Sequence, residues 1–244
     1  MKILGVIPAR FASTRFPGKP LVMIGDKTMI ERVYNQTKNS KKLDDVVVAT
    51  DDDRIYKHVL DFGGKVIMTA ENHQSGTDRC AEVALNYPDA DVIINIQGDE
   101  PFIDSDQIDL LCTCFENPET QIATLIRPIT DHAILASVNS PKVVINAKNE
   151  ALYFSRSVIP FLRNHAEENW LTYFPFYQHI GIYGYRKEIL KAISNLKPSS
   201  LELAENLEQL RWLENGYKIR TSISDHISIA IDTPEDLKNI EQYL

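Results

Sequence analysis

The sequence of 244 residues predicts a three-layer α/β fold, in which helices cover both faces of a mostly parallel sheet. In the first hundred residues, short β-branched runs alternate with stretches of helical periodicity. Two of these runs, residues 46–49 and 92–94, are almost continuously apolar, as strands buried on both faces are. Gly63 and Gly64 mark a clear stop between a helix and the next strand.

The first half of the chain is expected to form three successive βαβ crossovers. We predict strands at residues 3–7, 46–50, 65–68 and 92–96, separated by helices at 29–37, 53–62 and 77–86. Open α/β sheets bind their ligands at the carboxyl ends of the strands. The segments that directly follow these strands are therefore the first candidates for a functional site.

The second half has a different pattern. Strand-like runs occur at residues 122–126, 142–146, 151–154 and 178–185, and the segment 156–177 is irregular and aromatic. We interpret about 121–185 as a mixed-sheet insertion within a single domain, 1–244, because no Gly/Ser/Pro-rich linker separates it. Ser199 and Glu202 suit a capping box before a helix at 201–214, and Pro234 opens the last helix.

Composition excludes several classes of protein. With 43% apolar and 25% charged residues the chain is typical of a soluble globular protein, and its net charge of −8 argues against nucleic-acid binding. No apolar run approaches the length of a membrane span or signal peptide, so we expect a cytoplasmic protein without a membrane partner. Cys80, Cys112 and Cys114 lack zinc-site spacing, and we expect all three to be reduced.

A basic loop follows the first strand. Residues 8–21 read PARFASTRFPGKPL and contain Arg10, Arg15 and Lys19 within an acid-free run that extends from residue 1 to 25. Arginine forks and a lysine charge suit a triphosphate, whereas the alternative is a solvated basic loop. Its position after a strand favours phosphate binding. The loop matches neither a Walker A sequence nor a dinucleotide fingerprint.

Two further strands are expected to end in carboxylates. Asp99 follows the buried strand at 92–96, where an acid is costly unless it binds something, and Mg²⁺ takes one or two carboxylates together with phosphate oxygens. Capping of the next helix is a weaker explanation, because Ser105 and Asp106 are available for that purpose. Asp232 also precedes a helix, and there capping is a stronger alternative.

These segments together resemble the signature set of the 3-deoxy-manno-octulosonate cytidylyltransferases. The resemblance rests on the basic loop and on HQSGTDR (73–79), QGDEP (97–101) and DTPEDL (232–237). Further motifs similar to those of the family follow in the same order: ALYFSR (151–156), HIGIYGY (179–185) and LEQLR (207–211). The likeness therefore spans the chain from its first strand to its last helix.

The resemblance implies a nucleotide-diphospho-sugar transferase-like fold and an enzyme that transfers CMP from CTP to 3-deoxy-D-manno-octulosonate (Kdo). Pyrophosphate would leave in a single in-line displacement, and the product would serve lipopolysaccharide synthesis. The expected cofactor is Mg²⁺, and the expected assembly is a homodimer with the region 121–185 as a candidate interface. The family usually has glycine where this chain has Ala230.

The resemblance also assigns roles to particular residues. The residues that hold CTP would be Pro8, Ala9, Arg10, Arg15, Lys19, Ser75 and Gly76. Asp99 and Asp232 would bind the metal and, with Arg15 and Lys19, carry catalysis. The residues around the sugar acid would be Arg79, Gln97, Arg156, Arg163, His179, Tyr183, Glu208 and Gln209.

Without the resemblance, several of these residues have ordinary explanations. His179 and Tyr183 suit packing within a strand, and Arg156 and Arg163 suit an exposed surface. The expected helix at 201–214 buries a stripe of Leu203, Leu207 and Leu210, with Glu208 and Gln209 beside its edge.

Three alternative functions remain open at this point. Another nucleotidyltransferase, such as a CMP-sialate synthetase, would use similar loops. A nucleoside-diphosphate-sugar pyrophosphorylase is disfavoured, because those enzymes have a glycine-rich first loop and this one contains only Gly18. The third is a CTP-binding module without activity, which the presence of the basic residues and both acids makes improbable.

Overall fold

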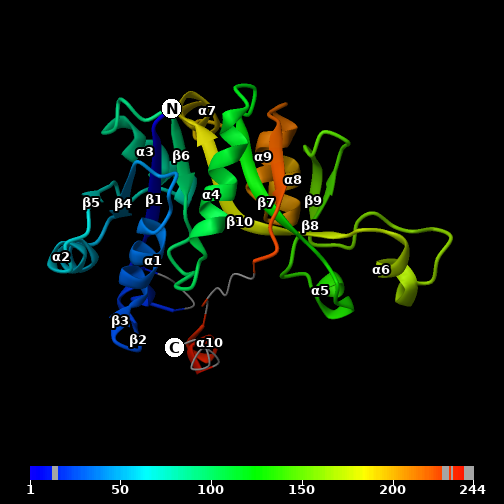
Figure 1. Ribbon diagram of the computed structural model, residues 1–244, viewed down its shortest axis with the longest axis horizontal. Coiled ribbons are helices and arrows are strands. Elements are labelled where there is room, and N and C mark those ends of the chain that lie inside the picture. Colours follow the sequence, from blue (N-terminus) through cyan, green and yellow to red (C-terminus); the bar gives the residue numbers. More distant parts are fainter. Residues whose placement is uncertain (13–15, 227–230, 232, 239–244) are drawn as a thin grey trace.

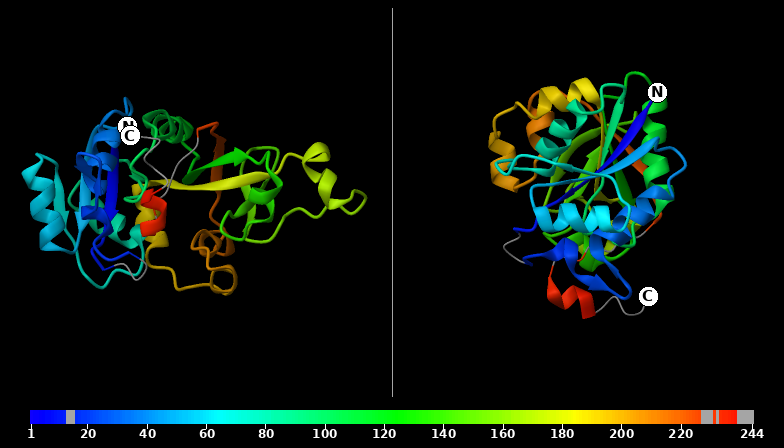
Figure 2. Two further views of the ribbon diagram at one scale, coloured as in Figure 1. Left: turned by 90° about the horizontal axis from the view of Figure 1, so that it is seen from below. Right: turned by 90° about the vertical axis from the view of Figure 1, so that its left-hand side faces the viewer.

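The computed structural model describes residues 1–12, 16–226, 231 and 233–238 (Figure 1). Within these residues, nine strands form one sheet, in the order β11-β7-β10-β6-β1-β4-β5, and the β8-β9 hairpin joins it through β10. Helices lie on both faces, which confirms the predicted three-layer α/β architecture (Figures 1 and 2).

The first half of the chain forms the parallel part of the sheet. β1 pairs in parallel with β4 on one side and β6 on the other, and β4 pairs in parallel with β5. The strands are β1 (Ile3–Ala9), β4 (Asp45–Thr50), β5 (Val66–Met68) and β6 (Val92–Asn95), and the crossovers are α1 (Met29–Lys38), α2 (Asp53–Asp61) and α3 (Gly76–Leu85). The three predicted crossovers are thus confirmed. The basic loop after β1 continues into η1 (Lys19–Leu21) and a hairpin of β2 (Met23–Ile24) and β3 (Lys27–Thr28).

The second half adds antiparallel pairs. β10 runs antiparallel to both β6 and β7, and β11, which the sequence analysis did not predict, pairs in parallel with β7. The strands of this half are β7 (Ile122–Pro128), β8 (Lys142–Ile145), β9 (Ala151–Ser155), β10 (Tyr177–Arg186) and β11 (Ile219–Ile223). All of the strands predicted here are present.

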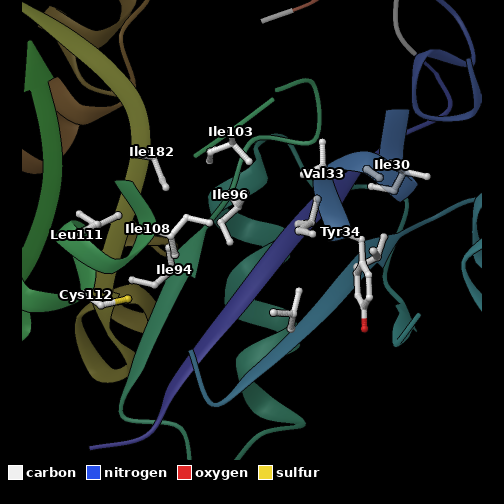
Figure 3. Packing of buried hydrophobic residues seen from close by; sticks show 14 of the residues in the cluster. Ile30, Val33, Tyr34, Ile94, Ile96, Ile103, Ile108, Leu111, Cys112 and Ile182 are labelled. Carbon is white, nitrogen blue, oxygen red and sulfur yellow. The ribbon is translucent and has the colours of Figure 1, made fainter. Parts of the chain in front are cut away.

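Two apolar layers hold the helices to the sheet. On one face α1, α2 and α4 pack against the strands, and Figure 3 shows Ile108 of α4 beside Ile94 of β6. On the other face lie α3, α7 and α9. The remaining helices are α4 (Ser105–Thr113), η2 (Cys114–Glu116), α5 (His132–Ala136), η3 (Glu167–Asn169), α6 (Trp170–Tyr173), α7 (Lys187–Ile193), α8 (Ser200–Glu205), α9 (Gln209–Glu214) and α10 (Pro234–Lys238).

The predicted single helix at 201–214 is wrong, because the chain breaks it into α8 and α9. Asn206 adopts left-handed dihedrals, with φ 51°, and thereby ends α8. Asparagine tolerates this conformation better than most residues. The break also changes the buried stripe: Leu207 and Leu210 are buried, whereas Leu203 is 71% exposed.

A second correction concerns α4. Its N-cap is Asp104, whose carboxylate accepts a hydrogen bond from the backbone of Asp106, so Ser105 and Asp106 lie inside the helix. Asp99 and Glu100 do not cap α4, because Asp104 does.

The segment between β9 and β10, residues 156–176, projects from the sheet as an arm that carries α6 (Figures 1 and 2). Its base has a small apolar cluster that includes Trp170 and Phe176. Toward the solvent, Phe161 and Tyr173 are 70% and 60% exposed.

The three cysteines are free thiols, as expected, and burial raises the pKa of Cys112 to about 12. Among the described helices, none combines the length and the apolar character that crossing a membrane requires.

Candidate functional site

The loops after β1 and β6 meet at one edge of the sheet. These strands are parallel neighbours, so their carboxyl ends lie together, and the backbone N–H of Ile96 donates to the carbonyl of Val6. A Cβ on Gly98 would lie 2.7 Å from the carbonyl oxygen of Pro8. Only glycine therefore allows the loop after β6 to approach Pro8 and Ala9 this closely.

The opposite charges of the two loops are paired. The ammonium of Lys19 lies 2.8 Å from a carboxylate oxygen of Asp99, and Asp99 remains 27% exposed. The backbone N–H of Ile231, the residue before Asp232 in the chain, donates to the carbonyl of Asp99 at 3.0 Å. Arg15 and Asp232, both predicted for this site, lie outside the described residues.

Arg10 connects the basic loop to the segment before α3. Its guanidinium donates to the carbonyl of His73, whose ring bonds the carboxylate of Glu82. Ser75 caps α3 in a capping box, and the Cβ position of Gly76 lies 3.5 Å from Pro8. The N-terminus of α3, with its partial positive charge, is therefore at the same edge as the basic loop.

A second group of polar side chains lies around Glu208. The hydroxyl of Thr77 donates to its carboxylate at 2.9 Å. Burial raises the pKa of Glu208, although the hydroxyls of Thr77 and Ser75 act in the opposite direction. Ser75 and Glu208 line the same cavity of about 550 Å³.

Several buried polar atoms lack a hydrogen bond of good geometry within the described part of the chain. They are Nε of Arg79, Oδ1 of Asn95, Nε2 of Gln209 and the hydroxyls of Tyr183 and Tyr185. Burial, and to a lesser extent the charge of Glu208, raises the pKa of both tyrosines, whereas the hydroxyls of Thr124 beside Tyr183 and Thr77 beside Tyr185 act in the opposite direction. Native proteins rarely bury such groups without a hydrogen bond, so this arrangement is suited to a polyhydroxylated ligand.

His179 lies on β10 and Gln97 bonds to β10, close to the point where the pairing of β10 with β7 is irregular. The register shifts between Ile180 and Tyr183, which turns the side chains of the strand. The ring of His179 bonds the hydroxyl of Thr124 at 3.0 Å, and burial lowers its pKa to about 3. The ring is therefore neutral at pH 7. Gln97 donates to the carbonyl of Gly181 at 2.7 Å.

The predicted arginines have different environments. Arg79 has no exposed surface; its guanidinium bonds Thr69 and Asp51, and its Nε has no partner among the described residues. Arg156 donates to the carbonyl oxygens of Glu205, Val138 and Asn206. Arg163 is exposed on the arm.

The sequence analysis missed Thr77, Asn95 and Tyr185. Asn95 had a signal, since an amide side chain at the end of an apolar strand is unusual. Thr77 lies within the quoted HQSGTDR segment, but only the fold brings it to Glu208, 131 positions later.

The cytidylyltransferase family model matches residues 4–219. A 3-deoxy-manno-octulosonate cytidylyltransferase of Bacteroides thetaiotaomicron is 59% identical, over 100% of this chain and 98% of the relative. The chain belongs to this family. Its member from Fusobacterium nucleatum is 47% identical, over 100% of this chain and 97% of the relative.

Solved structures agree with membership in the 3-deoxy-manno-octulosonate cytidylyltransferase family. A CMP:2-keto-3-deoxy-manno-octonic acid synthetase complexed with CTP superposes with a TM-score of 0.92 at 42% identity, covering 100% of this chain and 98% of the other. A 4-diphosphocytidyl-2C-methyl-D-erythritol synthase from Anaerococcus prevotii shares the fold, with a TM-score of 0.62 at 14% identity over 99% and 98% of the chains. The nucleotidyltransferase-like fold is thus confirmed, and the alternative functions are not favoured.

Proposed function

We propose that this protein transfers CMP from CTP to Kdo and releases pyrophosphate. The observation that carries the proposal is the meeting of the basic loop with the Asp99 loop, where Lys19 and Asp99 are 2.8 Å apart. Membership in the cytidylyltransferase family supplies the reaction class. A cationic loop beside an exposed carboxylate is what a metal-bound triphosphate requires.

In this reaction the anomeric hydroxyl oxygen of Kdo attacks the α-phosphorus of CTP. A new P–O bond forms as the bond to the β-phosphate bridging oxygen breaks, and the hydroxyl proton passes to solvent. Negative charge grows on the leaving pyrophosphate, so cations are needed where the phosphates lie. We assign this role to Arg10, Arg15 and Lys19, with Pro8, Ala9, Ser75 and Gly76 along the nucleotide.

We propose Asp99 and Asp232 as ligands of Mg²⁺. The donor set fits, because carboxylate oxygens suit this cation, and Ile231 connects the segment before Asp232 to Asp99 through a hydrogen bond of 3.0 Å. When bound, Mg²⁺ would neutralise phosphate charge and lower the pKa of the attacking hydroxyl.

For the sugar acid we propose the cavity beside Glu208. Its support is the buried Nε2 of Gln209, which has no partner among the described residues, and the Tyr183 hydroxyl, whose pKa the charge of Glu208 raises; with the Glu208 carboxylate they offer donors and acceptors for hydroxyl groups. Gln97, His179, Arg156 and Arg79 complete the proposed site, and Nε of Arg79 has no hydrogen-bond partner among the described residues.

The arm is the proposed contact between two copies of the chain. Exposed aromatic side chains, such as Phe161 and Tyr173, are typical of interfaces, and Arg163 lies on the same segment. A homodimer measured by sedimentation should dissociate in a Phe161→Glu, Tyr173→Glu variant. We also place the enzyme in the cytoplasm, where CTP is made, and its product in lipopolysaccharide synthesis.

The decisive experiment measures pyrophosphate release with CTP, UTP, ATP and GTP against Kdo, its 8-amino analogue and a sialic acid. Release with CTP and Kdo or the 8-amino analogue is the expected result. Turnover only with sialic acid would identify a CMP-sialate synthetase instead. Tight CTP binding without pyrophosphate release from any acceptor would identify an inactive module.

A further inference from the structure

A charged group behind the proposed sugar-acid site takes no part in the reaction as proposed. Glu205, the last residue of α8, uses both carboxylate oxygens on the end of β9. One accepts from the hydroxyl of Ser155 at 2.6 Å and the other from the backbone N–H of Arg156 at 3.0 Å. The carboxylate therefore ties α8 to β9.

The side chain of Arg156 also bonds the end of α8. Its Nε donates to the carbonyl of Glu205 at 2.7 Å, and its Nη2 donates to the carbonyl of Asn206 at 3.2 Å. The last carbonyls of a helix lack partners within the helix and carry partial negative charge. A guanidinium here satisfies them and fixes the break between α8 and α9.

Lys142 adds a buried cation to this group. Its side chain is fully buried, and its ammonium donates to the carbonyls of Ser137 at 2.7 Å and Arg156 at 2.6 Å. Burial lowers the pKa of Lys142, and the charge of Glu205 acts in the opposite direction. A buried ammonium is unfavourable without such an anion, so Glu205 and Lys142 support each other. We call Lys142, Ser155, Arg156 and Glu205 the clamp.

The clamp acts on the turn that carries the proposed substrate residues. Glu205 is followed by Asn206, in the left-handed region, and then by Leu207 and Glu208. One end of the clamp thus holds Arg156 and the other holds the residues just before Glu208. A small displacement of a binding group strongly weakens its contact with a substrate. The distance between the side chains of Arg156 and Glu208 therefore affects binding of the sugar acid.

We propose that Glu205 and Lys142 are positioning residues, which set the distance between Arg156 and Glu208 across the sugar-acid site. This inference rests on the proposed function. Neither residue touches the substrate. Loss of the clamp should therefore weaken the sugar-acid site selectively and leave the CTP site, on the loops after β1 and β6, intact.

The test compares Glu205→Gln with Glu214→Gln. Glutamine keeps the size of the side chain, but it has one acceptor oxygen in place of two and lacks the negative charge that supports Lys142. Glu214 is a matched control, because it also holds the two helices together, accepting from Ser200 at 2.9 Å and Leu201 at 3.1 Å. For Glu205→Gln we expect the KM for Kdo to rise by about tenfold and the KM for CTP to stay unchanged.

Two milder variants keep the test decisive if Glu205→Gln fails to fold. Ser155→Ala removes one hydrogen bond to Glu205, and Lys142→Met removes the buried charge at similar size; both should raise the KM for Kdo in the same selective way. Equal changes in the KM values for Kdo and CTP would overturn the inference. So would a rise in the KM for Kdo no larger than that of Glu214→Gln, when the two variants lose the same thermal stability. A wild-type enzyme that forms no CMP-Kdo would instead overturn the proposed function.

Discussion

The ammonium of Lys19 and the carboxylate of Asp99 lie 2.8 Å apart, although 80 positions separate them in the sequence. Their side chains are 13% and 27% exposed, so the pair is only partly screened by water. It marks the place where the loops after two parallel strands meet.

Removing either member of the pair should reduce catalysis while the fold survives. For Lys19→Met or Asp99→Asn we expect kcat to fall by roughly 10²-fold or more, the scale found when one electrostatic contact to a transition state is lost. Pyrophosphate release measures the effect. Lys57→Met on the exposed face of α2 is the control, and a near wild-type rate for Asp99→Asn would exclude the proposed mechanism.

Gly98→Ala should weaken CTP binding. The added Cβ would lie 2.7 Å from the backbone oxygen of Pro8, so the Asp99 loop has to move away from the basic loop. We expect the Kd for CTP, measured by calorimetry, to rise about tenfold for a displacement of this kind. Gly5→Ala on β1 is the control, because its Cβ would meet the core side chains of Leu43 and Ile96 instead. Equal CTP affinity in both variants would contradict the prediction.

Glu208→Gln should stabilise the protein and damage Kdo binding at the same time. Burial raises the pKa of Glu208 in the folded state, so its contribution to stability is most favourable below its ordinary pKa of 4.5 and declines as pH rises through the raised value. At pH 8 the variant should therefore unfold at a higher temperature than wild type, and near pH 4 the difference should vanish. Over the same range the KM for Kdo should rise about tenfold if Glu208 binds the sugar acid.

Glu214→Gln is the comparison, because the pKa of Glu214 is lowered whereas that of Glu208 is raised. A hydrogen bond from Ser199 is the main cause that lowers the pKa of Glu214; burial opposes it, and hydrogen bonds from Ser200 and the backbone of Leu201 lower the pKa further. Its replacement should not stabilise the protein at pH 8. Stabilisation of both variants would mean that loss of net charge, rather than burial of Glu208, is the cause.

The stability of the protein should fall in acid partly because of His179. Burial lowers its pKa to about 3, against an ordinary 6.5, so the unfolded chain binds a proton more readily between these values. The stability from the neutral ring is complete above pH 6.5 and is lost progressively as pH falls toward 3, at most about 1.4 kcal/mol per pH unit. Denaturant titrations at pH 7 and pH 5 should show a smaller loss for His179→Gln than for wild type. The exposed His132 is the control position, and His132→Gln should behave like wild type.

Local patterns in the sequence were enough to predict the parallel half of the fold. The alternation of β-branched runs with helical periodicity located the strands and crossovers within a few residues of their observed bounds. The charge of the basic loop and the acid after β6 were visible for the same reason, since each is a property of neighbouring residues. Because parallel strands end at one edge, the pattern also predicted that these loops meet.

The sequence by itself thus determined the α/β class, the basic loop, Asp99 and, through its motifs, the family. Only the tertiary structure decided which polar groups are still available to a ligand. Arg79 bonds Asp51, Arg156 bonds the carbonyl of Glu205, and Nε2 of Gln209 has no partner in the part of the chain that the structure describes. The break at Asn206 was likewise hidden, because a helix pattern does not reveal where contacts with β9 end the helix. Whether a polar group is available depends on hydrogen-bond partners that are distant in the sequence. Local periodicity carries no information about such partners.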